Sequence, residues 1–480
     1  RDLLRGEWGF SGLVISDYFG IAELERKHHV VEDLRAAGRK ALEAGVDIEL
    51  PEVEGYEALA EDVVGGRIPV SLVNQAVARV LRAKFLLGLF ERPYVEARSS
   101  EVERPSDRAL ARRAAEEAIV LLKNDGGLLP LDPARIKSIA VVGPNAATCR
   151  LGGYSGGPDR PVSVLEGISS RLGPETKILS APGCGLTRGN RGWSDDQVEL
   201  SDPAEDARLV SEAAKLSASA DVTVLVLGQN EQLSREGWAD NHRGDRMNLD
   251  LAGRQMDLAR AVLATGRPTV VILIHGGPLT VPELARSAPA ILDGFYLGEE
   301  TGAAVAAVLF GDVSPAGRLP MTVPRSVGTL PAYYNYKPSA RRPYLFEEPG
   351  PLWPFGFGLS YTTFRYSDLA VDPARIARDG RTTVTVTVTN RGGRASDEVV
   401  QLYIHDVVSS VTRPVQELKG FRRVHLQPGE SKRVEMTLGP EALSFFDETN
   451  KRVVEPGVFE VMVGGSSADV QKTRLDVLGP

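Results

Sequence analysis

Near its middle the chain reads Val222-Thr223-Val224-Leu225-Val226-Leu227-Gly228. A continuous run of β-branched and aliphatic residues that ends in glycine predicts a strand buried on both faces, as in a parallel sheet. Short runs of the same kind recur at residues 139–143, 270–274 and 290–292, with helical stretches between them. This alternation predicts an α/β domain, with a mostly parallel sheet covered by helices on both faces.

The first hundred residues show a similar alternation on a smaller scale. Apolar Leu13-Val14-Ile15 predicts a buried strand that ends abruptly at Ser16-Asp17. Residues 33–44 predict a helix with Gly45 at its C-terminus, and residues 46–50 predict a second strand. Two strand–helix units cannot bury both faces of a parallel sheet, so this segment needs more chain to complete its fold.

Two further helices are expected from the spacing of apolar side chains. One has Ser71 as its N-cap and ends near Gly88, and its apolar face consists of Val73, Val77, Val80 and Leu81. The other carries Ala115, Ile119 and Leu122 on one face and leads into the strand at 139–143.

The C-terminal part of the chain changes to a period of two. Thr383–Thr389 alternates strictly between threonine and valine, and residues 399–404 and 458–463 read as further strands. Short alternating strands joined by turns that contain Gly and Pro predict an immunoglobulin-like β-sandwich. The segment holds no catalytic triad and no metal-ligand motif, so we interpret it as a scaffold or docking domain. Residues 331–360, rich in Pro, Tyr and Gly, are expected to form an ordered connector.

The composition narrows the class of protein. Of the 480 residues, 42% are hydrophobic and 25% are charged, which is the balance of an ordinary globular protein. The formal net charge is −8 and no Lys/Arg run forms a basic stripe, so a nucleic-acid partner is not expected. No apolar stretch of about 18 residues predicts a membrane span. The two cysteines, Cys149 and Cys184, do not reveal the compartment.

Asp17 is the first candidate for chemistry, because it directly follows an apolar strand. A carboxylate at the C-terminal end of a strand lies where α/β enzymes place their active sites. A helix-capping or loop aspartate is the alternative that position alone leaves open.

A second candidate region follows the strand at 222–228. A polar loop runs from Gln229 through Glu236-Gly237-Trp238 to Gly244-Asp245-Arg246. Glu236 beside Trp238 would be a carboxyl group in a partly apolar setting, which suits a proton donor. The alternative is that the acidic residues of this loop are solvated surface charges; they are Glu231, Glu236 and Asp240.

Other polar motifs carry less weight. The glycine-rich stretch 152–157 lacks the spacing of both G-x-x-x-x-G-K-[ST] and G-x-G-x-x-G, which argues against nucleotide binding. His28-His29 reads as a polar helix start rather than a metal site, and we expect no metal and no other cofactor. His275-Gly276-Gly277 is interpreted as a turn after a core strand. H-E-x-x-H does not occur, which argues against a zinc protease.

Six blocks of the sequence resemble family 3 of the glycoside hydrolases and occur in the order that the family has them. The blocks are Leu4–Phe10 (LRGEWGF) with Val14–Tyr18 (VISDY), Ala44–Pro51 (AGVDIELP), Ala118–Asn124 (AIVLLKN), Leu128–Leu131 (LLPL), Gly311–Pro320 (GDVSPAGRLP) and Pro354–Tyr361 (PFGFGLSY). The resemblance implies α/β domains followed by an all-β domain. Residues 1–96 would be the C-terminal part of a TIM-like barrel, 107–330 an α/β sandwich, 331–360 a connector and 361–480 a fibronectin type III-like domain.

The resemblance also implies a retaining β-glycosidase that hydrolyses terminal non-reducing β-D-glucosyl residues of short oligosaccharides or other β-glucosides. Asp17 matches the family's nucleophile, and Glu236 matches its acid/base, with Glu231 as the competitor. The substrate-binding residues implied in this way are Tyr18, Tyr154, Ser155 and Trp238. Because the two carboxyl groups fall on different domains, the site is expected in a cleft between them.

The sequence departs from the family pattern in two places. Tyr18 stands where many members carry Trp, which alters how the sugar packs. The chain also begins with Arg1 near the end of the family's barrel, so most of the barrel positions that would hold the sugar are absent. We therefore expect the 480-residue chain alone neither to hydrolyse p-nitrophenyl β-glucoside nor to hold glucose well.

Three alternatives to a β-glucosidase stay open. They are a β-xylosidase, a non-catalytic carbohydrate-binding or interaction protein, and a nucleotide-binding α/β protein. The carboxylates at Asp17 and Glu236 argue against the second, and the missing phosphate-loop spacing argues against the third. The sugar, its linkage, the compartment (periplasmic, secreted or cytoplasmic) and a homodimeric state are not decided by the sequence.

Overall fold

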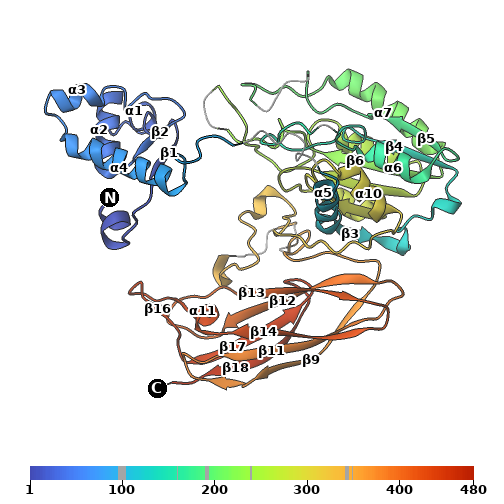
Figure 1. Cartoon of the computed structure of the whole chain (residues 1–480). Helices are drawn as coiled ribbons and strands as arrows, with labels where there is room; N and C mark the ends of the chain where they lie inside the picture. The colour runs from blue at the N-terminus through green and yellow to red at the C-terminus, as the bar shows by residue number, and fades with distance from the viewer. Residues whose placement is uncertain are drawn as a thin grey trace. The chain divides into compact units, whose positions relative to one another are not determined.

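The computed structural model describes residues 1–95, 104–158, 160–189, 194–237, 241–340, 345, 346, 348 and 350–479. It divides into two compact units, Arg1–Val102 and Glu103–Pro480, and each is described by itself (Figure 1).

The first unit is built on a pair of parallel strands with short helices around them. The strands are β1 (Ile15–Tyr18) and β2 (Ile48–Leu50), and the helices are α1 (Glu23–Arg26), α2 (Leu34–Ala44), α3 (Leu59–Val64) and α4 (Val70–Leu86). Helix α2 forms as predicted: Asp33 caps its first turn by accepting the amide of Ala36 at 2.6 Å, and Gly45 ends it with a φ of 97°.

Two predictions for this unit are wrong. Ser71 does not cap α4, because the helix begins at Val70 after Pro69, which places Ser71 inside the first turn. The strand that starts from Leu13-Val14-Ile15 is not buried, and the side chain of Ile15 is 48% exposed. The reason is that β1 and β2 form a two-stranded sheet of their own, which offers little surface for burial.

The second unit begins with an α/β domain around a six-stranded sheet. In spatial order its strands are β3 (Val120–Asn124), β8 (Ala290–Asp293), β7 (Thr269–Ile274), β6 (Val222–Gly228), β4 (Ser138–Val142) and β5 (Lys177–Ala181). All neighbouring pairs are parallel except β3 with β8. This arrangement confirms the predicted mostly parallel sheet. It also confirms the four predicted strands, at 139–143, 222–228, 270–274 and 290–292.

Helices cover both faces of this sheet, as the uninterrupted apolar strands require. One face packs against α5 (Pro105–Ala118), α6 (Val164–Leu172) and α10 (Thr301–Leu309). The other face packs against α7 (Pro203–Ala218), α8 (Gln255–Leu263) and α9 (Pro282–Ser287). In β6 the side chains alternate between the two cores: Val224 and Val226 face one, and Leu225 and Leu227 face the other.

The helix predicted to carry Ile119 and Leu122 ends earlier than expected. Helix α5 stops at Ala118, and the next residues form β3 at the edge of the sheet. Residues Ile119 to Leu122 are at most 3% exposed, because a strand in this position is buried on both faces. The apolar spacing at 115, 119 and 122 fits a helix, but four consecutive apolar residues also fit a buried strand. Strand β5 was not predicted.

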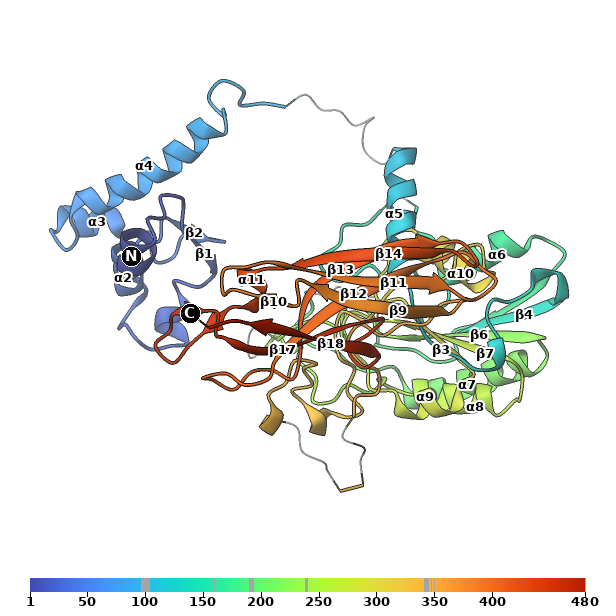
Figure 2. The same cartoon turned by 90° about the horizontal axis from the view of Figure 1, so that it is seen from below.

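The all-β part packs two sheets face to face (orange to red in Figures 1 and 2). One sheet has the order β10 (Arg375–Ile376), β18 (Val470–Val477), β17 (Gly457–Gly464), β12 (Ser396–Asp406) and β13 (Glu417–Leu426), and the other has β14 (Ser431–Leu438), β11 (Thr382–Asn390) and β9 (Phe364–Asp372). Three short elements follow β14 and precede β17 in the chain: α11 (Pro440–Leu443), β15 (Phe445–Phe446) and β16 (Arg452–Val453). The valines of the alternating run point into the core between the sheets, which confirms the predicted sandwich.

Candidate active site

Asp17 is the third residue of β1 and lies near the carboxyl end of that strand. Its neighbours tie the strand end to β2: the Ser16 hydroxyl accepts the amide of Leu50 at 2.9 Å, and the amide of Phe19 donates to the carbonyl of Leu50 at 2.9 Å. The Asp17 side chain is exposed, and its Oδ1 accepts the amide of Tyr18 at 2.7 Å. The carboxylate is thus oriented by its own backbone and open to solvent within its unit.

Glu236 lies in the loop that follows β6, and Tyr154 lies in the loop that follows β4. The Tyr154 hydroxyl donates a hydrogen bond of 3.0 Å to Glu236 Oε1, and both side chains are exposed. Strands β4 and β6 are parallel neighbours, so their carboxyl ends meet at one edge of the sheet. The sheet order therefore brings together two residues that the sequence analysis selected separately.

Glu231, the competitor for Glu236, has a different environment. Its Oε2 lies 3.3 Å from Arg150 Nη1, and its Oε1 accepts the amide of Leu151 at 3.3 Å. The Arg150 Nε in turn donates to Asn145 Oδ1 at 2.9 Å. Glu231 thus links the loop after β6 to the loop after β4, and its carboxylate is already occupied by these donors.

Ser155 is also occupied within its own loop, because its hydroxyl donates to the carbonyl of Leu151 at 2.6 Å. Asp17 and Tyr18 belong to the first unit, whereas Tyr154, Ser155 and Glu236 belong to the second. Trp238, named as a substrate-binding residue, and Asp240, named as a loop charge, lie outside the described residues.

Buried polar contacts support the loop that carries Glu236. Arg235 is buried and donates to the backbone carbonyls of Asp195, Asp196 and Arg243. The Ser234 hydroxyl lies 2.8 Å from the hydroxyl of Tyr296, and burial raises the pKa of Tyr296 to about 12. Tyr296 was not among the residues predicted from the sequence, although it follows a core strand just as the predicted residues do.

A hollow of about 250 Å³ borders the same loop. Its lining residues are Gln197, Val198, Leu200, Gln232, Leu233, Arg243, Gly244, Asp245 and Arg246. The Gly237 amide donates to Asp245 Oδ1 at 3.2 Å, so Asp245 is joined to the backbone next to Glu236.

The other predicted features have these positions. His28 is exposed and lies 4.0 Å from Glu23, in the turn between α1 and α2. Within the described ranges, no group of three or more His, Cys, Asp or Glu side chains is arranged to hold a metal ion. Cys149 and Cys184 are both free thiols. No helix in the part of the chain that the structure describes has the length and apolar character needed to cross a membrane.

Comparison with protein families identifies three matching regions. The glycosyl hydrolase family 3 C-terminal domain matches residues 119–361, and the family's N-terminal domain matches residues 1–83. A fibronectin type III-like domain matches residues 398–467. The α/β and all-β parts, with the carboxyl group at the sheet edge, therefore fall in the class of the glycoside hydrolases. Within that class, the chain belongs to glycosyl hydrolase family 3.

Individual relatives agree with this assignment. The chain is 41% identical to a β-xylosidase from Formosa agariphila, over 98% of this chain and 65% of the relative. It is 38% identical to the periplasmic β-glucosidase of Salmonella typhimurium, over 100% of this chain and 65% of that protein. The solved structure of a β-glucosidase from Erythrobacter marinus matches all of this chain and 65% of its own, with a TM-score of 0.95 and 43% identity. The chain thus spans about two thirds of the length of these relatives.

Proposed function

We propose that this chain carries the catalytic carboxyl groups of a retaining β-glycosidase, with Asp17 as the nucleophile and Glu236 as the acid/base. The observation that carries the proposal is the Glu236 carboxylate, held by Tyr154 at the carboxyl edge of the parallel sheet. The exposed Asp17 carboxylate at the end of β1 supplies the second group that this chemistry needs.

The proposed reaction has two steps. In the first, the Asp17 carboxylate attacks the anomeric carbon while the Glu236 carboxylic acid protonates the departing glycosidic oxygen, which leaves a covalent glycosyl ester on Asp17. In the second, the Glu236 carboxylate takes a proton from water, and the water oxygen attacks the anomeric carbon and releases Asp17. Such a pair of carboxyl groups works at a separation of about 5–5.5 Å and returns a sugar of retained configuration.

The proposed substrates are short oligosaccharides and other β-glucosides with a terminal non-reducing β-D-glucosyl residue. In support, a β-glucosidase from Listeria innocua that is 33% identical has been crystallised in complex with glucose, with a TM-score of 0.88. A β-xylosidase is the second candidate, because the Formosa agariphila relative carries that name at 41% identity.

We also propose the domain arrangement that the resemblance implied. Residues 1–96 correspond to the C-terminal part of a TIM-like barrel, 107–330 to an α/β sandwich, 331–360 to a connector and 361–480 to the fibronectin type III-like domain. The family match at residues 1–83 and the parallel β1–β2 pair support the first of these.

The test uses this chain and a chimera in which it is fused to the part of the Erythrobacter marinus β-glucosidase that it does not span. A 2-deoxy-2-fluoro-β-glucosyl fluoride should label Asp17 in the chimera, as peptide mass spectrometry would show, and Asp17→Asn should abolish labelling and turnover. Comparing p-nitrophenyl β-glucoside with the xyloside decides the sugar. Labelling at another carboxylate, or full turnover by Asp17→Asn, would overturn the assignment.

A further inference from the structure

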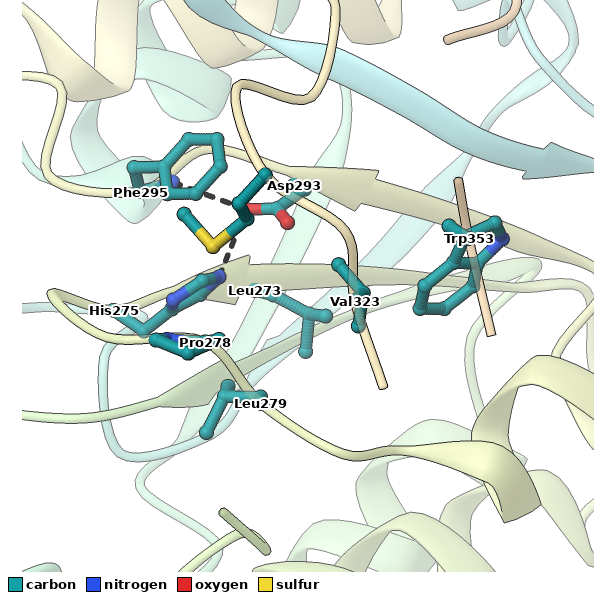
Figure 3. A pocket seen from close by; sticks show the side chains of 9 residues that line it. Leu273, His275, Pro278, Leu279, Asp293, Phe295, Val323 and Trp353 are labelled. Atoms are coloured by element: carbon teal, nitrogen blue, oxygen red, sulfur yellow. Dashed lines mark hydrogen bonds and ion pairs between the residues drawn. The ribbon is translucent and has the colours of Figure 1, made fainter. Parts of the chain in front are cut away.

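A buried histidine–aspartate pair lies at the carboxyl ends of two central strands, next to the loop that carries Glu236. His275 directly follows β7, and Asp293 is the last residue of β8; their exposed fractions are 2% and 4%. His275 Nε2 lies 2.9 Å from Asp293 Oδ1 (Figure 3). His275 Nδ1 lies 2.6 Å from the carbonyl oxygen of Gly277. From the sequence alone, this histidine is expected only as part of a turn.

The two partners determine the charge of the ring. A carbonyl oxygen can only accept a hydrogen bond, so the contact with Gly277 requires a proton on Nδ1. An ionised Asp293 carboxylate is likewise an acceptor, and its contact then requires a second proton on Nε2. A histidine with protons on both nitrogens is an imidazolium, and the pair is therefore a buried ion pair.

Among the described residues, the lining of the pocket around the pair contains no other ionisable side chain. The small pocket around it is lined by Leu273, Pro278, Leu279, Phe295, Met321, Val323 and Trp353, and His275 and Asp293 are the only ionisable residues of this lining (Figure 3). Its volume of about 10 Å³ holds at most one water molecule and excludes a sugar. Burial by itself lowers the pKa of His275, but Asp293 and the Gly277 carbonyl outweigh it, so the net pKa is raised above the ordinary value.

On the β7 side, the pair fixes a turn that touches the loop carrying Glu236. The amides of Gly276 and Gly277 both donate to Gln229 Oε1, at 3.3 Å and 3.2 Å. Gln229 is the first residue of that loop, and its own amide donates to the carbonyl of Ile274. Gly276 also packs so closely that an added Cβ would lie 2.9 Å from the Cβ of Ser234.

On the β8 side, the pair fixes the segment that holds Tyr296. Asp293 Oδ1 accepts the amide of Phe295 at 3.3 Å, and the Phe295 ring lies 5.1 Å from that of His275. The next residue, Tyr296, contacts the hydroxyl of Ser234 at 2.8 Å. Gly276 on the β7 side and Tyr296 on the β8 side therefore both pack against Ser234, which lies two residues before Glu236.

We propose that His275 and Asp293 are positioning residues, whose buried ion pair holds the 229–237 loop so that Glu236 is presented at the sheet edge. This inference rests on the proposed role of Glu236 as the acid/base. Removing either partner frees the turn at Gly276-Gly277 or the segment at Phe295-Tyr296, and Glu236 then loses its fixed position without losing any contact of its own.

The first experiment needs no activity and uses the 480-residue chain. Histidine side-chain NMR should show both ring nitrogens of His275 protonated at pH 7.5, with His275→Asn assigning the resonance. Hydrogen exchange of residues 229–237 should become about ten-fold faster in His275→Asn and in Asp293→Asn, because local opening of a loop follows its lost anchors. His405→Asn is the matched control, since His405 Nδ1 also binds a backbone carbonyl, that of Pro414, but in the β-sandwich.

The second experiment measures turnover of p-nitrophenyl β-glucoside by the chimera. His275→Asn and Asp293→Asn should each lower kcat about ten-fold with KM changed less than two-fold, because a displaced proton donor impairs the reaction more than binding.

The outcomes separate the two proposals. A neutral His275 at pH 7.5, or unchanged exchange of residues 229–237 in both variants, overturns the positioning role whatever the activity. An active wild-type chimera whose two variants keep full kcat overturns it as well. An inactive wild-type chimera with the expected NMR and exchange results overturns the proposed function instead, and leaves the ion pair as the anchor of the loop.

Discussion

The Tyr154 hydroxyl donates to the Glu236 carboxylate across 3.0 Å, although the two residues are 82 positions apart in the chain. The bond exists because β4 and β6 are adjacent and parallel, so the loops that leave them lie side by side. It is the direct structural link between two residues that the sequence suggested for different roles.

Replacing Tyr154 by Phe removes this bond and leaves the ring. Because both side chains are exposed, the free energy of unfolding should change by less than about 0.5 kcal/mol. The kcat of the chimera should fall about ten-fold, because the proton donor loses a partner that orients it. Exposed Tyr333→Phe serves as the control and should leave kcat unchanged. Equal kcat for Tyr154→Phe and wild type would contradict an orienting role.

Glu231→Gln and Glu236→Gln should affect different properties of the protein. Glu236→Gln should lower kcat by at least about 100-fold for substrates with poor leaving groups, because it removes the general acid. Azide should restore turnover of activated substrates by that variant. Glu231→Gln should instead lower the free energy of unfolding by about 1 kcal/mol, because the partly buried pair with Arg150 is lost. If azide rescues Glu231→Gln and not Glu236→Gln, the assignment of the two residues is reversed.

A buried ion pair joins the α/β domain to the β-sandwich. Arg318 Nη2 lies 2.7 Å from Glu398 Oε2, with side chains 9% and 4% exposed, and the Tyr366 hydroxyl donates to Glu398 Oε1. Glu398→Ala leaves a buried guanidinium without this partner, so the free energy of unfolding in urea should fall by about 3 kcal/mol. The double variant Arg318→Met with Glu398→Leu should lie within about 1 kcal/mol of wild type. A double variant as unstable as Glu398→Ala would contradict this explanation.

Asp406 should make the stability depend on pH. Burial raises the pKa of this carboxyl to about 6, although Arg413 acts in the opposite direction. Its Oδ2 has no hydrogen-bond partner among the residues that the structure describes. The folded protein therefore binds this proton more tightly than the unfolded chain, and the carboxylate destabilises the fold increasingly as the pH rises from about 4 to about 6. Asp406→Asn should raise the Tm at pH 7.5, which corresponds to a gain of about 1 kcal/mol in the free energy of unfolding. At pH 4 the same substitution should not raise the Tm.

Asp447 is the matched control for that measurement. Backbone amides of Lys451 and Thr449 and the Thr449 hydroxyl lower the pKa of Asp447. The stabilisation of the fold by the Asp447 carboxylate is fully present above the pKa that this group has in the unfolded chain. It is lost as the pH falls through the lowered pKa of the folded state. Asp447→Asn should therefore lower the Tm at pH 7.5, opposite in sign to Asp406→Asn. If both substitutions change the Tm in the same direction, removal of the negative charge, and not the local environment of each carboxyl group, determines the change in Tm.

Several elements of the fold were predictable from local sequence. The apolar run at 222–228 has to be buried on both faces, and it forms the centre of the parallel sheet. The alternation at 383–389 has one apolar side, and it forms the inner face of a sandwich. Asp33 and Gly45 bound a helix because capping depends on residues close in sequence. Ser71 failed as a cap because the helix begins one residue earlier, at Val70, with Pro69 in the N-cap position.

Residues 119–122 show where local sequence is not enough. Their apolar pattern satisfies both a helix and a strand, and pairing of β3 with the distant β8 decides between them. The same limit applies to the site. A polar residue after an apolar strand marks Asp17 and Glu236 as candidates, because strand ends are visible in the sequence. Which carboxylate is left open depends on partners from other loops: Arg150 occupies Glu231, whereas Tyr154 reaches Glu236.

The sequence by itself thus determined the central strands of the α/β sheet, the alternating strands of the sandwich and the family, because these follow from residue type, spacing and motif. Only the tertiary structure decided which side chains share a site. The spatial order of β8, β7, β6 and β4 brings together loops that are distant in the chain, and the contacts of Tyr154 with Glu236 and of His275 with Asp293 arise from that order.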